Sequence, residues 1–137
     1  MPHSHQIFNE FECVFMSFFA DVTEKDLIDS YNCLIADPSY NPSYKHLADF
    51  SYANSIEVRS EFVRRLAKKA RLAPGTKKAI VVGNDLFFGL SRMYMAQHPR
   101  QSEVELFRDY KEACRWLGLP IDDKLFMEIE EDFLVKD

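Results

Sequence analysis

The sequence lacks the long apolar runs and the leader-like start that mark membrane and secreted proteins. None of its apolar runs approaches the roughly 18 residues that a helix needs to cross a bilayer. No Lys or Arg precedes the first apolar residues, so the N-terminus does not resemble a signal peptide. We therefore expect a cytoplasmic protein without a membrane span.

Cysteine is scarce and widely spaced. The three cysteines are Cys13, Cys33 and Cys114. No pair has the spacing of a zinc site or a redox motif, and each lies among apolar neighbours. We expect free, buried thiols in a reducing compartment.

Patterns that would indicate catalysis or metal binding are also missing. Local spacing yields no Ser-His-Asp, Cys-His or paired-carboxylate arrangement. The four histidines are scattered: His3, His5, His46 and His98. His3 and His5 could approach one metal ion, but no carboxylate or cysteine lies nearby at ligand spacing. We therefore expect a protein that is not an enzyme and holds neither a cofactor nor a metal.

An excess of positive charge is absent, because the net charge is −5. A nucleic-acid partner is therefore not expected, since binding to phosphates depends on Lys and Arg. The bases nevertheless cluster between positions 64 and 78, where seven occur without an acid. This basic cluster could bind anions or a membrane surface. A solvated helix face is the simpler explanation. The cluster consists of Arg64, Arg65, Lys68, Lys69, Arg71, Lys77 and Lys78.

Apolar residues, in contrast, are abundant. They make up 47% of the 137 residues, and 12 of them are phenylalanines. This much apolar surface offsets the entropy lost on folding, which excludes a disordered chain. The length fits a single domain, and no break in composition suggests a second one, so we assign residues 1–137 to one unit.

The first part of the chain predicts two strands and a helix. Aromatic residues dominate positions 6–20, which favours two short strands around a turn at Asn9-Glu10. Thr23 begins an amphipathic helix that ends at Ala36, and Asp26 completes a capping signature three residues after Thr23. The apolar stripe expected to be buried comprises Leu27, Ile28, Tyr31, Leu34 and Ile35.

The rest of the chain alternates between strand and helix patterns. A short strand over 45–50 precedes a helix capped by Asn54, with Glu57 three residues on. A β-branched run at 78–82 reads as a buried central strand, and a third helix covers about 86–97. A strand at 103–107 and a helix capped by Asp109 follow, and an amphipathic tail helix covers about 122–134. This alternation predicts an α/β fold with a mixed sheet.

Six segments, in order, carry a family resemblance. They are Asp37-Pro38, Leu47–Phe50, Ala79–Val82, Phe88–Tyr94, Val104–Asp109 and Glu112–Leu117. In this order they resemble the bacterial STAS/SEC14-like proteins related to the anti-sigma-factor antagonist SpoIIAA, most of which are uncharacterised. The resemblance covers roughly residues 10 to 119, leaves out the tail, and is most specific around Gly89 and Trp116.

The resemblance implies a STAS-type fold, with a mixed sheet of four or five strands and helices mainly on one face. It also implies a domain that acts by binding proteins, some members binding nucleotides or lipids. In the antagonist proteins, a serine at the start of the second helix is phosphorylated. Ser55 is the nearest positional match and Ser51 the second. A helix N-terminus there would favour a phosphate. Capping is the simpler explanation, because it alone accounts for both Asn54 and Ser55.

A second candidate site follows the buried strand. Gly83, Asn84 and Asp85 lie between this strand and a helix, where open α/β sheets bind ligands. A turn with an N-cap is the simpler explanation. Gly89 within the helix suggests either close packing on the sheet or close approach of a ligand or partner helix. Arg92, one turn later, could bind a carboxylate or phosphate, or form a structural salt bridge.

The first functional hypothesis is a non-enzymatic binding module that acts through an unidentified protein partner. The second is a carrier or sensor of a small apolar or amphipathic ligand, with Phe and Met lining a pocket. The third is an enzyme of unrecognised type. The tail helix must also bury its apolar face, either on its own sheet or in a homodimer. A sizeable apolar cavity would favour the second hypothesis.

Overall fold

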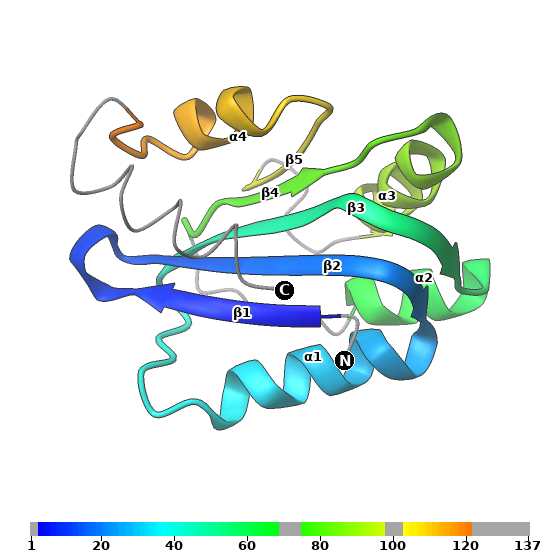
Figure 1. Cartoon of the computed structure of the whole chain (residues 1–137), viewed down its shortest axis with the longest axis horizontal. Coiled ribbons are helices and arrows are strands. Elements are labelled where there is room, and N and C mark those ends of the chain that lie inside the picture. The colour runs from blue at the N-terminus through cyan, green and yellow to red at the C-terminus, as the bar shows by residue number, and fades with distance from the viewer. Residues whose placement is uncertain (1–2, 69–74, 98–102, 122–137) are drawn as a thin grey trace.

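The computed structural model describes residues 3–68, 75–97 and 103–121. These residues form one five-stranded sheet, with strand order β1-β2-β3-β4-β5, and its helices (Figure 1). The elements are β1 (His3–Phe8), the 3-10 helix η1 (Asn9–Phe11), β2 (Cys13–Thr23), α1 (Glu24–Ala36), β3 (Lys45–Glu57), α2 (Ser60–Lys68), β4 (Lys78–Val81), α3 (Asp85–Gln97), β5 (Val104–Phe107) and α4 (Tyr110–Trp116). The predicted order of strands and helices is confirmed. The predicted tail helix at 122–134, and with it the homodimer alternative, lies outside the described residues.

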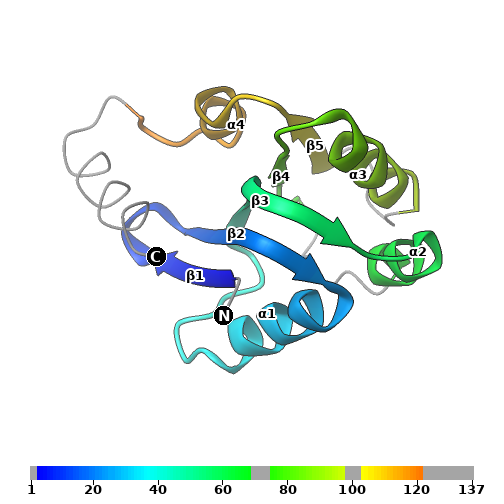
Figure 2. The same ribbon diagram turned by 45° about the vertical axis from the view of Figure 1, so that its right-hand side comes forward.

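The strand order explains which face each helix covers. β1 is antiparallel to β2, whereas β2, β3, β4 and β5 are successive parallel neighbours. Crossovers between parallel strands are right-handed, so steps in one direction across the sheet place their helices on one face. α1, α2 and α3 therefore lie on the same side, and α4, which follows the last strand, covers the other (Figure 2). The predicted mixed sheet with helices mainly on one face is confirmed.

Side chains alternate between two cores. Phe15, Leu47 and Val81 point toward α4 and pack with Ala113 and Cys114. Their neighbours along the strands point to the opposite face, where two further apolar clusters contact α1, α2 and α3. The central strands are thus buried on both faces, which is why they read as continuous apolar runs.

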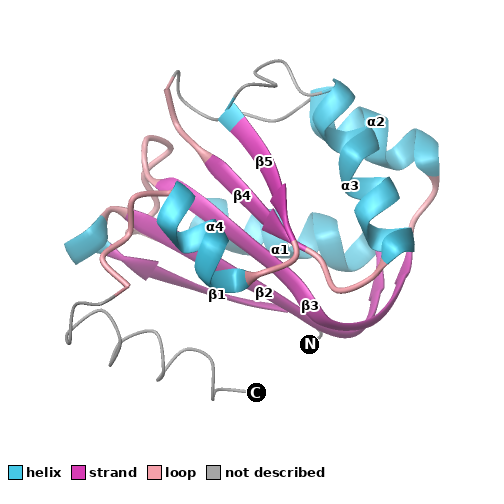
Figure 3. Cartoon of the chain, turned by 90° about the horizontal axis from the view of Figure 1, so that it is seen from above, coloured by secondary structure: helices cyan, strands magenta, loops and turns pink. Residues whose placement is uncertain are grey.

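β3 is much longer than the sequence predicts. We expected a strand over 45–50 and a helix starting at Asn54, and this prediction is wrong, because β3 continues to Glu57. Its pairing with β2 extends through Asp21↔Ser55 and Thr23↔Glu57, with two register shifts on the way. Figure 3 shows the two strands curving together beyond β4 and β5. Ladder pairing with a distant strand outweighs the local capping signature.

α2 begins only at Ser60, just after an ion pair that joins it to the start of α1. The Arg59 guanidinium donates to both Glu24 carboxylate oxygens, at 3.0 Å and 2.9 Å, and the Arg59 backbone N–H adds a third bond of 2.8 Å. These bonds hold the pKa of Glu24 below its usual value. The ends of β2 and β3 are thereby fixed beside each other.

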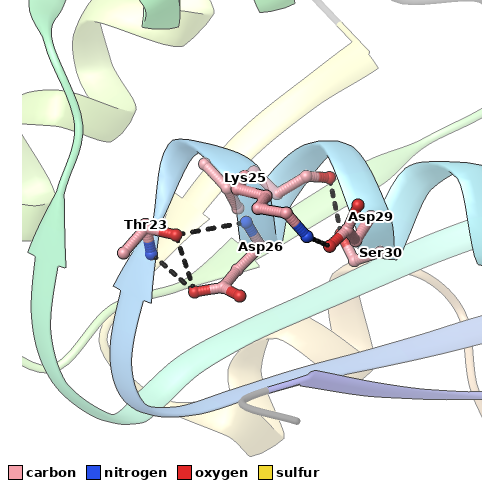
Figure 4. A network of polar contacts seen from close by, with 6 residues as sticks. Thr23, Lys25, Asp26, Asp29 and Ser30 are labelled. Carbon is pink, nitrogen blue, oxygen red and sulfur yellow. Dashed lines mark hydrogen bonds and ion pairs between the residues drawn. The ribbon is translucent and has the colours of Figure 1, made fainter.

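The predicted start of α1 is confirmed in detail. Asp26 accepts from the Thr23 backbone N–H at 2.9 Å, and Thr23 Oγ1 accepts from the Asp26 N–H at 3.3 Å (Figure 4). The predicted buried stripe is wrong for most of its members. Only Leu34 is buried, whereas Leu27 and Tyr31 are half-buried and Ile28 and Ile35 are each 46% exposed. Most of this stripe faces a cavity, described below.

Two further expectations need correction. Cys13 and Cys114 are buried and free as predicted, but Cys33 is exposed. Gly89 is also exposed, and a Cβ at that position would meet nothing within 4 Å, so close packing on the sheet does not explain this glycine. No helix in the described residues is long and apolar enough to cross a membrane.

Removal of the α1 cap should destabilise the protein. Thr23→Ala removes the side-chain oxygen that accepts from the Asp26 N–H, and we expect a loss of about 1 kcal/mol in the free energy of unfolding. Lys25→Ala is the matched control, because it removes only an exposed ion pair to Asp29 and should change stability by less than about 0.5 kcal/mol. Urea denaturation measures both, and equal effects would contradict a role for the cap.

Gly89→Ala should stabilise the protein. An exposed helical glycine loses about 0.5–1 kcal/mol relative to alanine, and the added Cβ meets no atom within 4 Å. Gly118→Ala is the contrasting variant, because Gly118 has a φ of +77° and a side chain there costs about 1 kcal/mol. Thermal unfolding should therefore shift in opposite directions. A destabilised Gly89→Ala variant would show that this position requires glycine for another reason.

Candidate functional site

The principal feature of the three-helix face is a cavity of about 480 Å³. α1 packs over β1 and β2, whereas α2 packs against α3 and α3 lies over β5. The cavity lies between these two groups of helices, above β2, β3 and β4, and all six elements contribute to its lining. Its volume falls within the range of about 300–1,000 Å³ found for small-molecule sites.

The parallel register of β3 and β4 places the side chains of the cavity floor in pairs. His46 pairs with Lys78 at the start of the two strands, and Ala48 pairs with Ile80 two residues further along. The next side chain of β3 on this face is Phe50, whose ring stacks on Phe18 at 4.3 Å between centroids. The small Ala48 at the centre of the floor leaves space that a larger side chain would fill.

The walls come from the three helices. α1 contributes the partly exposed stripe residues Leu27, Ile28 and Tyr31 together with buried Leu34. The opposite wall consists of apolar side chains from α2 and α3: Val63, Leu66, Phe87 and Leu90. An amphipathic helix that faces a cavity has the same periodicity as one that faces a packed core. This is why the sequence predicts burial of the stripe where the structure has an open wall.

Two lining side chains, His46 and Lys78, place polar groups at the end of the cavity where β3 and β4 begin. Lys78 Nζ donates to Tyr94 Oη at 3.2 Å and lies 5.0 Å from the centre of the Tyr94 ring. The Tyr40 ring meets the His46 ring edge-on at 6.4 Å. No Asp or Glu is among the lining residues in the described part of the chain. The cavity thus has a cationic end and a mostly apolar lining, to which Ser30, Asn32 and Ser91 also contribute.

His46 is the most perturbed group at this end. Its side chain is only 4% exposed, and Nε2 has no hydrogen-bond partner among the described residues. Burial, and secondarily the charge of Lys78, lowers the pKa of His46 to about 3. The imidazole is therefore neutral near pH 7, and its unpartnered nitrogen carries the unfavourable free energy of a buried polar atom.

The candidate serines do not lie at a helix start. Ser51, Asn54 and Ser55 all lie on β3, so the predicted position of the phosphate-accepting loop is wrong. Ser51 donates from its backbone N–H and its hydroxyl to Asp49, at 2.9 Å and 2.6 Å. Ser55 donates to Asp21 at 2.8 Å. Phosphorylation of Ser51 or Ser55 stays a prediction, but a phosphate on either serine would meet a neighbouring carboxylate.

The residues after β4 form the turn and helix N-cap that were the simpler explanation of Gly83, Asn84 and Asp85. Asn84 caps α3 by accepting from the Phe87 N–H at 3.0 Å. Asp85 pairs with Arg108 at 2.6 Å, and the Arg108 guanidinium lies 4.6 Å from the centre of the Phe88 ring. None of Gly83, Asn84 and Asp85 lines the cavity. The crevice prediction therefore chose the correct β4–α3 unit but not the residues that face the open space.

Gly89 and Arg92 are also not part of the cavity lining, whereas their neighbours Leu90 and Ser91 are. Arg92 lies 6.0 Å from the centre of the Phe88 ring. The expected salt bridge of Arg92 is not found within residues 3–68, 75–97 and 103–121. Ligand approach at Gly89 or Arg92 stays a prediction.

The basic cluster is not one surface. Lys77 lies just before β4 and Lys78 is its first residue, and the two side chains serve opposite faces of the sheet. Lys77 Nζ donates to the Trp116 carbonyl at 3.2 Å, whereas Lys78 lines the cavity. Arg64, Arg65 and Lys68 are exposed on α2, as expected for a solvated helix face, and Lys69 and Arg71 lie outside the described residues.

The histidines do not assemble a metal site in the described part of the chain, where no group of three potential ligands is found. His5 Nε2 lies 3.0 Å from Asp37 Oδ2, and this contact lowers the pKa of Asp37. His3 is buried, and burial lowers its pKa. His98 lies outside the described residues.

Sequence reasoning missed the residues that give the cavity its chemistry. His46 was counted among scattered histidines, and Lys78 was counted within the basic cluster. Tyr94 and Ala48 were named only as members of longer segments. One sequence feature could have indicated them. His46 and Lys78 each lie at the start of a buried strand, and parallel pairing of these strands brings the two polar residues together.

Comparisons with known proteins identify the fold of this chain. No protein-family model matches the chain, and no curated protein matches it. A similar solved structure is the crystal structure of an uncharacterized protein of the DUF3478 family, with a SpoIIAA-like fold, from Shewanella loihica PV-4. The TM-score is 0.59 at 16% identity, and the match covers 85% of this chain and 94% of that chain.

An identity this low supports a shared fold and not a shared function. The match agrees with the observed sheet, whose five mixed strands carry helices mainly on one face. The resemblance noted in the sequence is therefore confirmed at the level of architecture: the chain has a SpoIIAA-like α/β fold.

Proposed function

We propose that this domain binds a small apolar or amphipathic ligand in the cavity between α1 and the α2–α3 pair. The observation that carries the proposal is the cavity itself, with about 480 Å³ of space above the central strands. Its lining is predominantly apolar with a few convergent polar groups, which is the usual composition of a small-molecule site. An apolar occupant would remove the lining from water, and this is favourable in proportion to the area covered.

A binding role fits the lining better than a catalytic one. The lining residues in the described chain include no Asp, Glu or Cys. His46 has a pKa of about 3, far below the value near the working pH that suits a general base. We therefore propose that the domain is a carrier or sensor of a ligand rather than an enzyme. Action through a protein partner stays a prediction, now without the helix-start serine on which its switch was based.

Filling the cavity should abolish ligand binding. Ala48→Phe adds a ring at the centre of the floor, whereas Ala36→Phe makes the same chemical change at an exposed position near the end of α1. We expect the neutral probe N-phenyl-1-naphthylamine to bind the wild type and Ala36→Phe with similar Kd. Binding to Ala48→Phe should be at least about tenfold weaker. The added ring fills space that the probe would occupy, so the probe loses several kcal/mol of favourable binding free energy.

Fluorescence titration measures the binding, and circular dichroism with thermal unfolding verifies that each variant is folded. Native mass spectrometry of protein purified from its own host gives a second readout, because a retained ligand adds a discrete mass. A wild type that does not bind the probe, or an Ala48→Phe variant that binds it equally well, would overturn the proposed function.

A further inference from the structure

The two ends of the cavity differ in chemistry. At the start of β3 and β4, the lining includes a lysine, a histidine and the Tyr94 hydroxyl. At the other end, it includes the stacked rings of Phe18 and Phe50 together with Ile56 and Val58. A ligand that satisfies both ends has a polar head and an apolar chain.

The positive charge at the polar end of the cavity determines which charge the head group of a ligand should carry. Lys78 forms no ion pair with any acid in the described ranges, and the cavity lining includes no Asp or Glu there. Its ammonium has three N–H donors, of which one reaches Tyr94. A cation in a largely apolar cavity without a carboxylate favours an anionic ligand, since the attraction is stronger where water is partly excluded.

His46 supplies a second, independent indication. His46 lines the same end of the cavity, and its buried Nε2 has no partner among the described residues. A neutral imidazole can carry its proton on Nε2 and donate it. A ligand oxygen at this position would accept that bond and remove the unfavourable burial of the unpaired nitrogen. Lys78 and His46 are direct neighbours in the β3–β4 register, so both can reach one head group.

We propose that the polar end binds the carboxylate of an unbranched aliphatic acid, held by Lys78 and His46, and that its chain lies along the floor toward the Phe18–Phe50 stack. This inference rests on the proposed function. A singly charged head matches Lys78, the one Lys or Arg among the described lining residues. From His46 to Phe50 the floor spans about 13 Å at the rise of a strand, which suits a medium-length extended chain.

The test compares ligands that differ only in the head. Decanoate, 1-decanol, decyl phosphate and decyltrimethylammonium compete with N-phenyl-1-naphthylamine for the wild type at low salt. We expect decanoate to bind about tenfold or more tightly than 1-decanol, as a charge-assisted hydrogen bond implies. Decyl phosphate should bind no more tightly than decanoate, and the cationic amphiphile most weakly.

A matched pair of variants locates the head group. Lys78→Met removes the cavity ammonium and keeps an apolar stem, whereas Lys77→Met makes the same change one residue earlier, where the ammonium lies 5.0 Å from the Trp116 ring on the other face. We expect Lys78→Met to weaken decanoate about tenfold and to leave 1-decanol unchanged. Lys77→Met should leave both affinities unchanged.

The outcomes separate this inference from the proposed function. Equal binding of decanoate and 1-decanol to the wild type would overturn the carboxylate site and leave the apolar cavity intact. Tighter binding of decyl phosphate would reassign the head group. Failure of every decyl compound and of the neutral probe to bind would overturn the proposed function itself. The wild-type selectivity needs no variant, so the inference can be refuted even if Lys78→Met does not fold.

Discussion

The parallel pairing of β2 with β3 is the constraint on which the rest of the structure depends. It runs from Cys13↔Lys45 to Thr23↔Glu57, so ten steps along β2 match twelve along β3. The two extra residues on β3 create irregularities that increase twist and bend the strand pair. β4 pairs only with the first part of β3, from His46 to Asp49. The curved end of the ribbon therefore extends beyond β4 and carries the start of α2 with it. Among the described helices, none covers the floor between α1 and α2.

The sequence was sufficient for the architecture because periodicity and crossover handedness act over short stretches. The capping box at Thr23 and the caps at Asn84 and Asp109 all lie where local patterns predict them. The end of β3 could not be predicted in this way. Asn54 and Glu57 satisfy a helix-start pattern, but β2 offers the same backbone a ladder whose existence depends on residues more than thirty positions away. A local preference worth about 1 kcal/mol does not prevail over several ladder bonds.

The candidate site was harder to predict for a related reason. His46 and Lys78 are adjacent only because β3 and β4 pair in that register, and neither belongs to a motif. The α1 stripe was recognised correctly as apolar, yet periodicity cannot distinguish a helix that packs on a core from one that walls a cavity. The residues that were predicted, Gly83, Asn84 and Asp85, have turn and cap chemistry that is visible in sequence. These residues can be recognised in the sequence because they form a turn and a cap, and not because they line the cavity.

Lys77 and Lys78 show why environment, and not residue type, carries the functional interpretation. Each ammonium lies 5.0 Å from an aromatic ring, Trp116 for one and Tyr94 for the other. Lys77 also donates to a main-chain carbonyl at the end of α4, so its contacts serve to attach that helix to the sheet. Lys78 lines the cavity beside a neutral histidine whose Nε2 has no partner in the part of the chain that the structure describes. The SpoIIAA-like fold sets the backbone positions of both lysines, but Lys78 lines an open cavity because no described helix covers this part of the sheet. The specificity of the proposed binding site should therefore depend on the packing between α1 and α2 and on the first residues of β3 and β4, which can vary without any change of fold.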